Sequence, residues 1–124
     1  KYSSDYEQAF VSIQDQVTTY DKQLESLKAN IDQNQNDLKS RGDDLANRRK
    51  DIEQGIAKAK GEELNPQIDS FNSAVASYND LLSRTKDMIE TYNSIIAKRN
   101  DLVTEEKSLI QAIDANLNPL DSEQ

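Results

Sequence analysis

Apolar residues recur in alternating steps of three and four along almost the whole chain, in two runs separated by a short break with Gly61 and Pro66. A period of 3.5 residues sustained over this length is typical of a coiled coil, because it keeps one narrow apolar face toward a neighbouring helix. The first run comprises Tyr6, Phe10, Ile13, Val17, Tyr20, Leu24, Leu27, Ile31, Leu38, Leu45 and Ile52. The second comprises Leu64, Ile68, Phe71, Val75, Tyr78, Leu82, Ile89, Tyr92, Ile96, Val103, Ile110, Ile113 and Leu117.

The composition fits a thin apolar contact between helices better than a thick core. The 124 residues include no Trp, and their mean hydropathy is -0.89. The net charge of -8 disfavours nucleic acid and anionic membranes as partners, because both attract clustered Lys and Arg. No apolar run approaches the roughly 18 residues of a membrane-spanning helix. The absence of Cys is compatible with any compartment and leans toward an extracytoplasmic one. Because the chain starts at Lys1 rather than Met, we expect it to be part of a larger parent protein.

The residue pattern predicts one helical hairpin with a first helix over 4–59, a turn over 60–65, a second helix over 66–117 and a frayed tail over 118–124. Ser4 and Glu7 fit a capping box at the first helix start. Gly61 suits the left-handed conformation beyond a helix end, and Asn65-Pro66 is typical of a helix beginning. Because the connection is short, we expect the two helices to be antiparallel neighbours.

One register matches both apolar runs, since the residue numbers of opposed positions then add to 123. This register pairs Ile52 with Phe71, Leu45 with Tyr78, Ile31 with Tyr92, Ile13 with Ile110 and Tyr6 with Leu117. The weak point is Gly42, because Gly inside a helix costs about 1 kcal/mol relative to Ala. A break at Gly42 would give three helices, but Leu38 and Leu45 keep the same phase across it.

The second helix carries more apolar surface than a two-helix contact needs. One further apolar residue precedes the coiled-coil position a in five successive heptads. We call this set the third apolar row: Leu81, Met88, Ile95, Leu102 and Leu109. The matching positions of the first helix are polar: Gln16, Gln23, Asn30, Asp37 and Asp44. Either the first helix shields the row, or the row packs on the parent protein or on a second copy, giving a homodimeric four-helix bundle.

The d positions of the first helix change character half-way along it. Tyr6, Ile13, Tyr20 and Leu27 give way to Asn34, Arg41, Arg48 and Gly55. We therefore expect the half near the termini to pack more tightly than the half near the turn.

Basic residues gather before the turn, where residues 39–60 have a local net charge of +3. Five of them could contact an acidic partner at the tip of the hairpin: Arg48, Arg49, Lys50, Lys58 and Lys60. The alternative interpretation is a solvated surface whose lysines compensate the helix dipole.

The sequence contains no candidate catalytic residues. Without His or Cys the chain has no Ser-His or Cys-His dyad and no His-based or thiolate metal site. No Gly-rich phosphate loop occurs. We therefore expect no enzyme activity, no cofactor and no metal.

The heptads of the second helix repeat a Tyr-Asn-x-aliphatic-aliphatic pattern, at Tyr78–Leu82 and Tyr92–Ile96. This pattern is similar to coiled-coil stalks of bacterial envelope proteins, some of which carry a separate matrixin-like metalloprotease domain. The resemblance implies an extracytoplasmic stalk or assembly segment, with any enzyme elsewhere in the parent protein. The leading hypothesis is accordingly a non-enzymatic stalk, spacer or self-assembly module. The alternative is a tether or chaperone-like hairpin that grips a partner with its basic tip.

Overall fold

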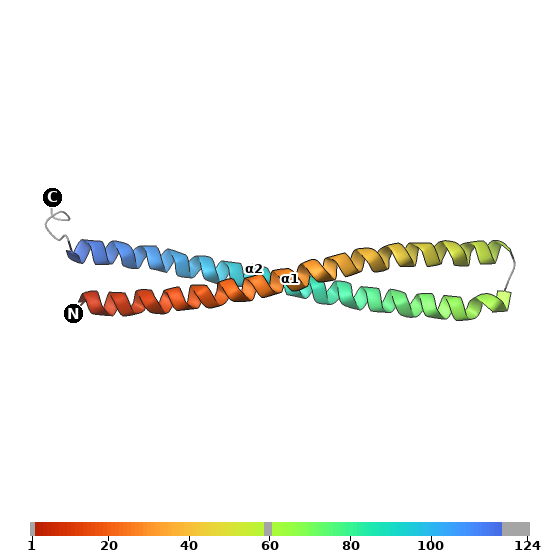
Figure 1. Ribbon diagram of the computed structural model, residues 1–124, viewed down its shortest axis with the longest axis horizontal. Helices are drawn as coiled ribbons and strands as arrows, with labels where there is room; N and C mark the ends of the chain where they lie inside the picture. The colour runs from red at the N-terminus through yellow and green to blue at the C-terminus, as the bar shows by residue number, and fades with distance from the viewer. Residues whose placement is uncertain (1, 59–60, 118–124) are drawn as a thin grey trace. The chain divides into compact units, whose positions relative to one another are not determined.

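The chain forms two helices joined by a short connection, which confirms the predicted all-α helical hairpin (Figure 1). The computed structural model describes residues 2–58 and 61–117. Helix α1 spans Tyr2–Ala57, a 3-10 helix η1 spans Gly61–Leu64, and α2 spans Asn65–Leu117. The described part of the chain contains no strand. The predicted tail at 118–124 and the turn residue Lys60 lie outside the described residues.

Helix α1 begins earlier than its sequence suggested and, as predicted, is a single helix through Gly42. The capping box at Ser4 is wrong, because Tyr2 and Ser3 are already helical and Ser4 therefore lies inside the helix. The helix also continues through Gly42 without a break. Leu38 is buried just before this glycine, and Leu45 is half-buried just after it. Packing on both sides thus offsets the propensity cost of a single glycine.

The connection between the helices is itself partly helical. Gly61 has the positive φ, 41°, that its sequence context predicted. The four residues from Gly61 to Leu64 form η1, and α2 follows immediately with Pro66 in its first turn. Leu64 is 4% exposed, so the connection contributes a core residue as well as a change of direction.

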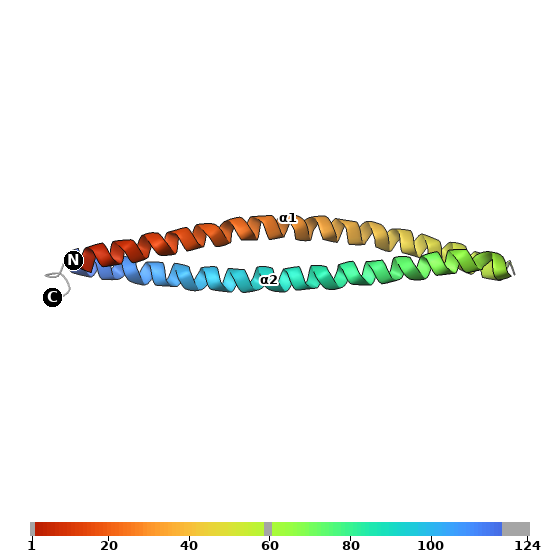
Figure 2. The same cartoon turned by 90° about the horizontal axis from the view of Figure 1, so that it is seen from below.

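The hairpin divides into two compact units. The terminal unit contains Lys1–Lys28 and Thr91–Gln124, and the turn unit contains Ala29–Glu90. In the terminal unit, the beginning of α1 runs beside the end of α2, as Figures 1 and 2 both show. Arg99 of α2 donates a hydrogen bond to Asp21 of α1 there. Among the described residues of the terminal unit, Ile13 is the one that is buried.

Among the residues whose burial is described, the turn unit has more buried residues than the terminal unit. Its buried residues are Ile31, Leu38, Gly55, Leu64 and Thr85. The expectation that the terminal half would pack more tightly is therefore wrong at the level of individual side chains. At Gly55 the absence of a side chain lets Leu64 of η1 pack close to the backbone of α1, and both residues are buried.

The observed register also differs from the predicted one. A Cβ atom placed on Gly42 would lie 3.7 Å from Cε2 of Tyr78, whereas the predicted register sets Leu45 against this tyrosine. In the terminal unit Arg99 bonds to Asp21, where the prediction sets Leu24. The partners in α1 are thus about three residues earlier than predicted. Apolar positions in steps of three and four fit both registers, so the pattern alone does not choose between them.

Candidate interaction surface

The third apolar row is half-buried along its whole length. Leu81 and Met88 belong to the turn unit, and Ile95, Leu102 and Leu109 belong to the terminal unit. All five side chains have intermediate exposure. Each remains partly accessible to a further partner.

Helix α1 provides part of the cover of this row. In the turn unit, the Asn34 amide lies 3.4 Å from the Met88 sulfur. In the terminal unit, Leu109 lines a groove together with Ala9 and Ile13 of α1. The first interpretation, shielding by the other helix, therefore accounts for part of the row. Packing of the remainder on a second copy or on a parent protein stays a prediction.

The two flanks of α2 differ in chemistry. The third apolar row occupies one flank, and four exposed asparagines recur on the other: Asn72, Asn79, Asn93 and Asn100. A partner that buries apolar surface would gain free energy on the first flank, whereas on the second it would remove amides from water. The two flanks are therefore not equivalent as docking surfaces.

A shallow groove lies on the third-row side of α2 in each unit. The groove of the terminal unit has a volume of about 380 Å³ and is lined by Ala9, Ile13, Thr104, Glu105, Ser108 and Leu109. The groove of the turn unit has a volume of about 340 Å³ and is lined by Arg48, Asp51, Ile52, Pro66, Gln67 and Ser70. Gln67 lies two heptads before Leu81, so it occupies the same heptad position as Leu109. Both grooves therefore contain a residue at the position of the third apolar row.

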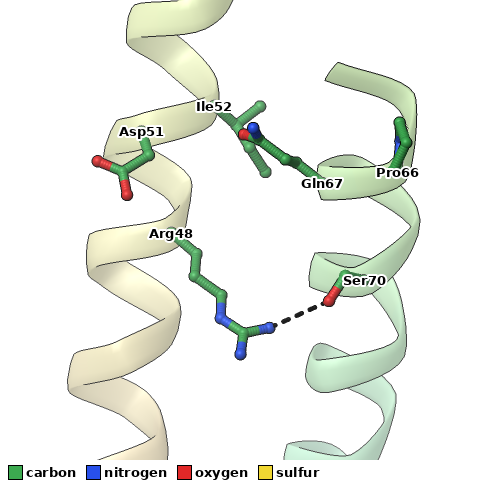
Figure 3. Close-up of a pocket in the computed structure, with 6 residues that line it drawn as sticks. All are labelled: Arg48, Asp51, Ile52, Pro66, Gln67 and Ser70. Atoms are coloured by element: carbon green, nitrogen blue, oxygen red, sulfur yellow. Dashed lines mark hydrogen bonds between the residues drawn. The ribbon is translucent and has the colours of Figure 1, made fainter. Parts of the chain in front are cut away.

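The close-up of the second groove shows how the helices contribute to it. Arg48 reaches from α1 toward α2 and lies 3.4 Å from the Ser70 hydroxyl (Figure 3). The Gln67 side chain points toward Ile52, whereas Asp51 points away from α2. The groove thus combines an apolar floor at Ile52 with hydrogen-bond donors from Arg48 and Gln67.

The predicted basic tip is paired with acids on its own helix. Arg48 forms an ion pair of 3.0 Å with Asp44, and Arg49 forms one of 3.0 Å with Glu53. Lys50 and Lys58 are exposed, and Lys60 lies outside the described residues.

The acids that follow the turn reduce the positive charge of this tip further. Glu62, Glu63 and Asp69 are exposed near its end, so residues 39–69 contain seven basic and seven acidic side chains. The hypothesis that the tip grips an acidic partner stays a prediction. The positive charge on which it depends is balanced by the neighbouring acidic side chains.

Two ionic contacts were not foreseen from the heptad pattern. Arg99 occupies a d position, where an apolar residue is usual, and donates to Asp21 across the hairpin. Arg84 donates to Asp80 one turn earlier on the same helix. In each case the hydrogen bond, followed by the attraction of the carboxylate, raises the pKa of the arginine. The sequence signal for the contact of Arg99 with Asp21 was an arginine at position d, which holds Phe71 and Tyr92 in other heptads.

Two buried residues of the turn unit were also missed as packing elements. Gly55 is buried, and a Cβ atom added there would overlap the Leu64 side chain. Thr85 is 2% exposed and donates its hydroxyl to the Leu81 carbonyl at 2.7 Å. A hydroxyl satisfied within its own helix can occupy a buried position without a partner on the other helix.

The described residues contain no group of three or more Asp, Glu, His or Cys side chains placed to hold a metal ion. Neither described helix has the length and apolar character needed to cross a bilayer. Comparisons with protein-family models, with curated proteins and with solved structures find no match.

Proposed function

We propose that this chain is a non-enzymatic coiled-coil hairpin that serves as a stalk or self-assembly segment of a larger protein. One observation carries the proposal: an apolar row continues along α2, and α1 covers it only in part. Three half-buried leucines, one isoleucine and one methionine at seven-residue spacing are what a further helix needs for packing. The resemblance of the Tyr78 and Tyr92 heptads to envelope stalks favours an extracytoplasmic location in bacteria.

Burial of the third apolar row would favour association. If about 300 Å² of the apolar row became buried, it would contribute about 7 kcal/mol before the costs of association.

Sedimentation equilibrium of the chain at high micromolar concentration tests this proposal. We expect a dimer or larger species that the double variant Ile95→Asp with Leu102→Asp dissociates, since the new carboxylates would be desolvated in the contact. The matched control is Asn93→Asp with Asn100→Asp, which adds the same charge on the opposite flank and should leave the assembly intact. A strict monomer would contradict the self-assembly part of the proposal.

A further inference from the structure

Beside the third apolar row, α2 carries two exposed residues of opposite charge at equivalent heptad positions. Lys98 and Glu105 are seven residues apart in the terminal unit, and each precedes a leucine of the row by four positions. Neither forms an ion pair with another described residue. Their outer position next to Leu102 and Leu109 would place them at the edge of any contact made by these leucines.

On the basis of the function proposed above, we propose that the partner of the terminal unit is a second copy of this chain, docked with its α2 antiparallel to the first. Leu102 lies on the two-fold axis and meets Leu102 of the other copy. Ile95 of each copy then packs on Leu109 of the other. In the same register, Lys98 of each copy faces Glu105 of the other, and symmetry makes this ion pair twice.

Charge selects this orientation over the parallel one. In a parallel pair of identical helices, the edge that carries Lys98 and Glu105 on one helix faces the edge that carries Arg99 and Glu106 on the other. Glu105 would then lie against Glu106, and Lys98 would lie beside Arg99, which Asp21 already pairs. Like charges at the edge of a helix contact are destabilising, whereas the antiparallel register sets Lys98 against Glu105 and makes the contact attractive. An isologous antiparallel contact also closes on itself and gives a dimer rather than a filament.

The shape of the terminal unit fits the same side. Its groove is lined by Glu105 and Leu109 of α2 together with Ala9 and Ile13 of α1. A side chain from the second copy can therefore enter between the helices next to the predicted ion pair. The opposite flank presents asparagines such as Asn93, which offer neither an apolar floor nor a charge pair.

Charge exchange tests the predicted ion pairs. Lys98→Glu alone sets two carboxylates against each other at both edge contacts, and Glu105→Lys alone sets two lysines against each other there. We expect each variant to raise the dimer dissociation constant by about tenfold or more in low salt. An equimolar mixture should restore dimerisation as a heterodimer, because both edge contacts are then attractive. The control Lys107→Glu makes the same charge change on the other flank and should leave the dissociation constant unchanged.

Cysteine crosslinking tests the orientation, because the chain has no Cys of its own. We expect Ile95→Cys mixed with Leu109→Cys to give a crosslinked heterodimer under mild oxidation, and neither variant to crosslink efficiently by itself. Leu102→Cys should crosslink with itself across the two-fold axis. Circular dichroism of each variant checks that the helices remain folded.

The outcomes separate this inference from the proposed function. Efficient self-crosslinking of Ile95→Cys would indicate a parallel contact and overturn the inference while leaving self-assembly intact. A dimer that survives both charge variants and forms none of the crosslinks would also overturn it, since another surface would then make the contact. A monomer at all concentrations would overturn the inference and the self-assembly part of the proposed function together.

Discussion

The two units of the hairpin differ in how many of their described residues are buried. The unit with fewer large apolar residues at the d positions of α1 has more buried residues. The terminal unit has the larger apolar d residues on α1, such as Ile13 and Leu27, yet among its described residues only Ile13 is buried. The turn unit has Asn34 and Gly55 at the same heptad positions, and five of its described residues are buried. Between two helices, the distance of approach decides how completely a side chain is covered. A small residue on one helix can bury a large one on the other.

Gly55 and Gly42 show two uses of the same amino acid within the turn unit. The backbone at Gly55 is in close contact with Leu64, and a side chain added at Gly55 would force the Leu64 side chain to move. At Gly42 the nearest atoms of Tyr78 lie at an ordinary contact distance, 3.7 and 3.9 Å, from where a Cβ atom would be. Substitutions at these positions therefore separate packing from helix propensity.

The largest expected effect comes from the side chain that the close approach buries. Leu64→Ala should lower the free energy of unfolding by about 2–4 kcal/mol, because it removes buried apolar atoms and leaves a cavity against Gly55. Urea unfolding followed by circular dichroism measures the loss. The control is Ile56→Ala, which truncates a 61% exposed side chain next to Gly55 and should change stability by less than about 0.5 kcal/mol. Equal losses in both variants would contradict the contrast in burial.

Gly55→Ala should be destabilising in spite of the better helix propensity of alanine. The gain in propensity is about 1 kcal/mol, whereas overpacking a buried contact costs about 1–3 kcal/mol, so we expect a net loss of about 1 kcal/mol. A double-mutant cycle with Leu64→Ala identifies the cause. The loss at Gly55 should disappear when Leu64 is already truncated, because the added methyl group then has room. Additive effects would show that the overlap is not responsible.

Gly42→Ala should have the opposite sign. The new methyl group meets Tyr78 without overlap, so the propensity gain of about 1 kcal/mol should appear as a higher urea midpoint. The variant Gly42→Ala with Tyr78→Ala checks that the gain is local to the helix, because it should persist without the tyrosine. A loss of stability on Gly42→Ala would mean that the helices approach at Gly42 as closely as they do at Gly55.

The smallest expected effect belongs to the terminal unit, at the contact of Asp21 with Arg99. Both side chains remain partly exposed to solvent, so their coupling should be weak and should vanish in about 1 M salt. A double-mutant cycle of Asp21→Ala and Arg99→Ala, measured at low and high salt, gives this coupling. A strong coupling that persists in high salt would contradict this expectation, because it would mean that a specific polar contact holds the terminal unit together.

Much of the fold could be predicted from the sequence because it depends on periodicity. The steps of three and four fix the helical state, and Gly61 and Pro66 mark where the chain changes direction. The start of α1 was missed because Ser4 and Glu7 match a capping box that the helix does not use. Of the candidate surface, the residues of the third apolar row were predictable by counting. Their partial cover by residues of α1 was not.

The sequence by itself determined that two helices form, where they reverse and which residues of each are apolar, because these properties depend on local spacing. Only the tertiary structure decided the register, the burial of Leu64 and Thr85 and the grooves beside α2. The physical reason is that several registers satisfy the same apolar pattern. The choice among them depends on which side chains meet in space, such as Tyr78 beside Gly42 and Leu64 beside Gly55.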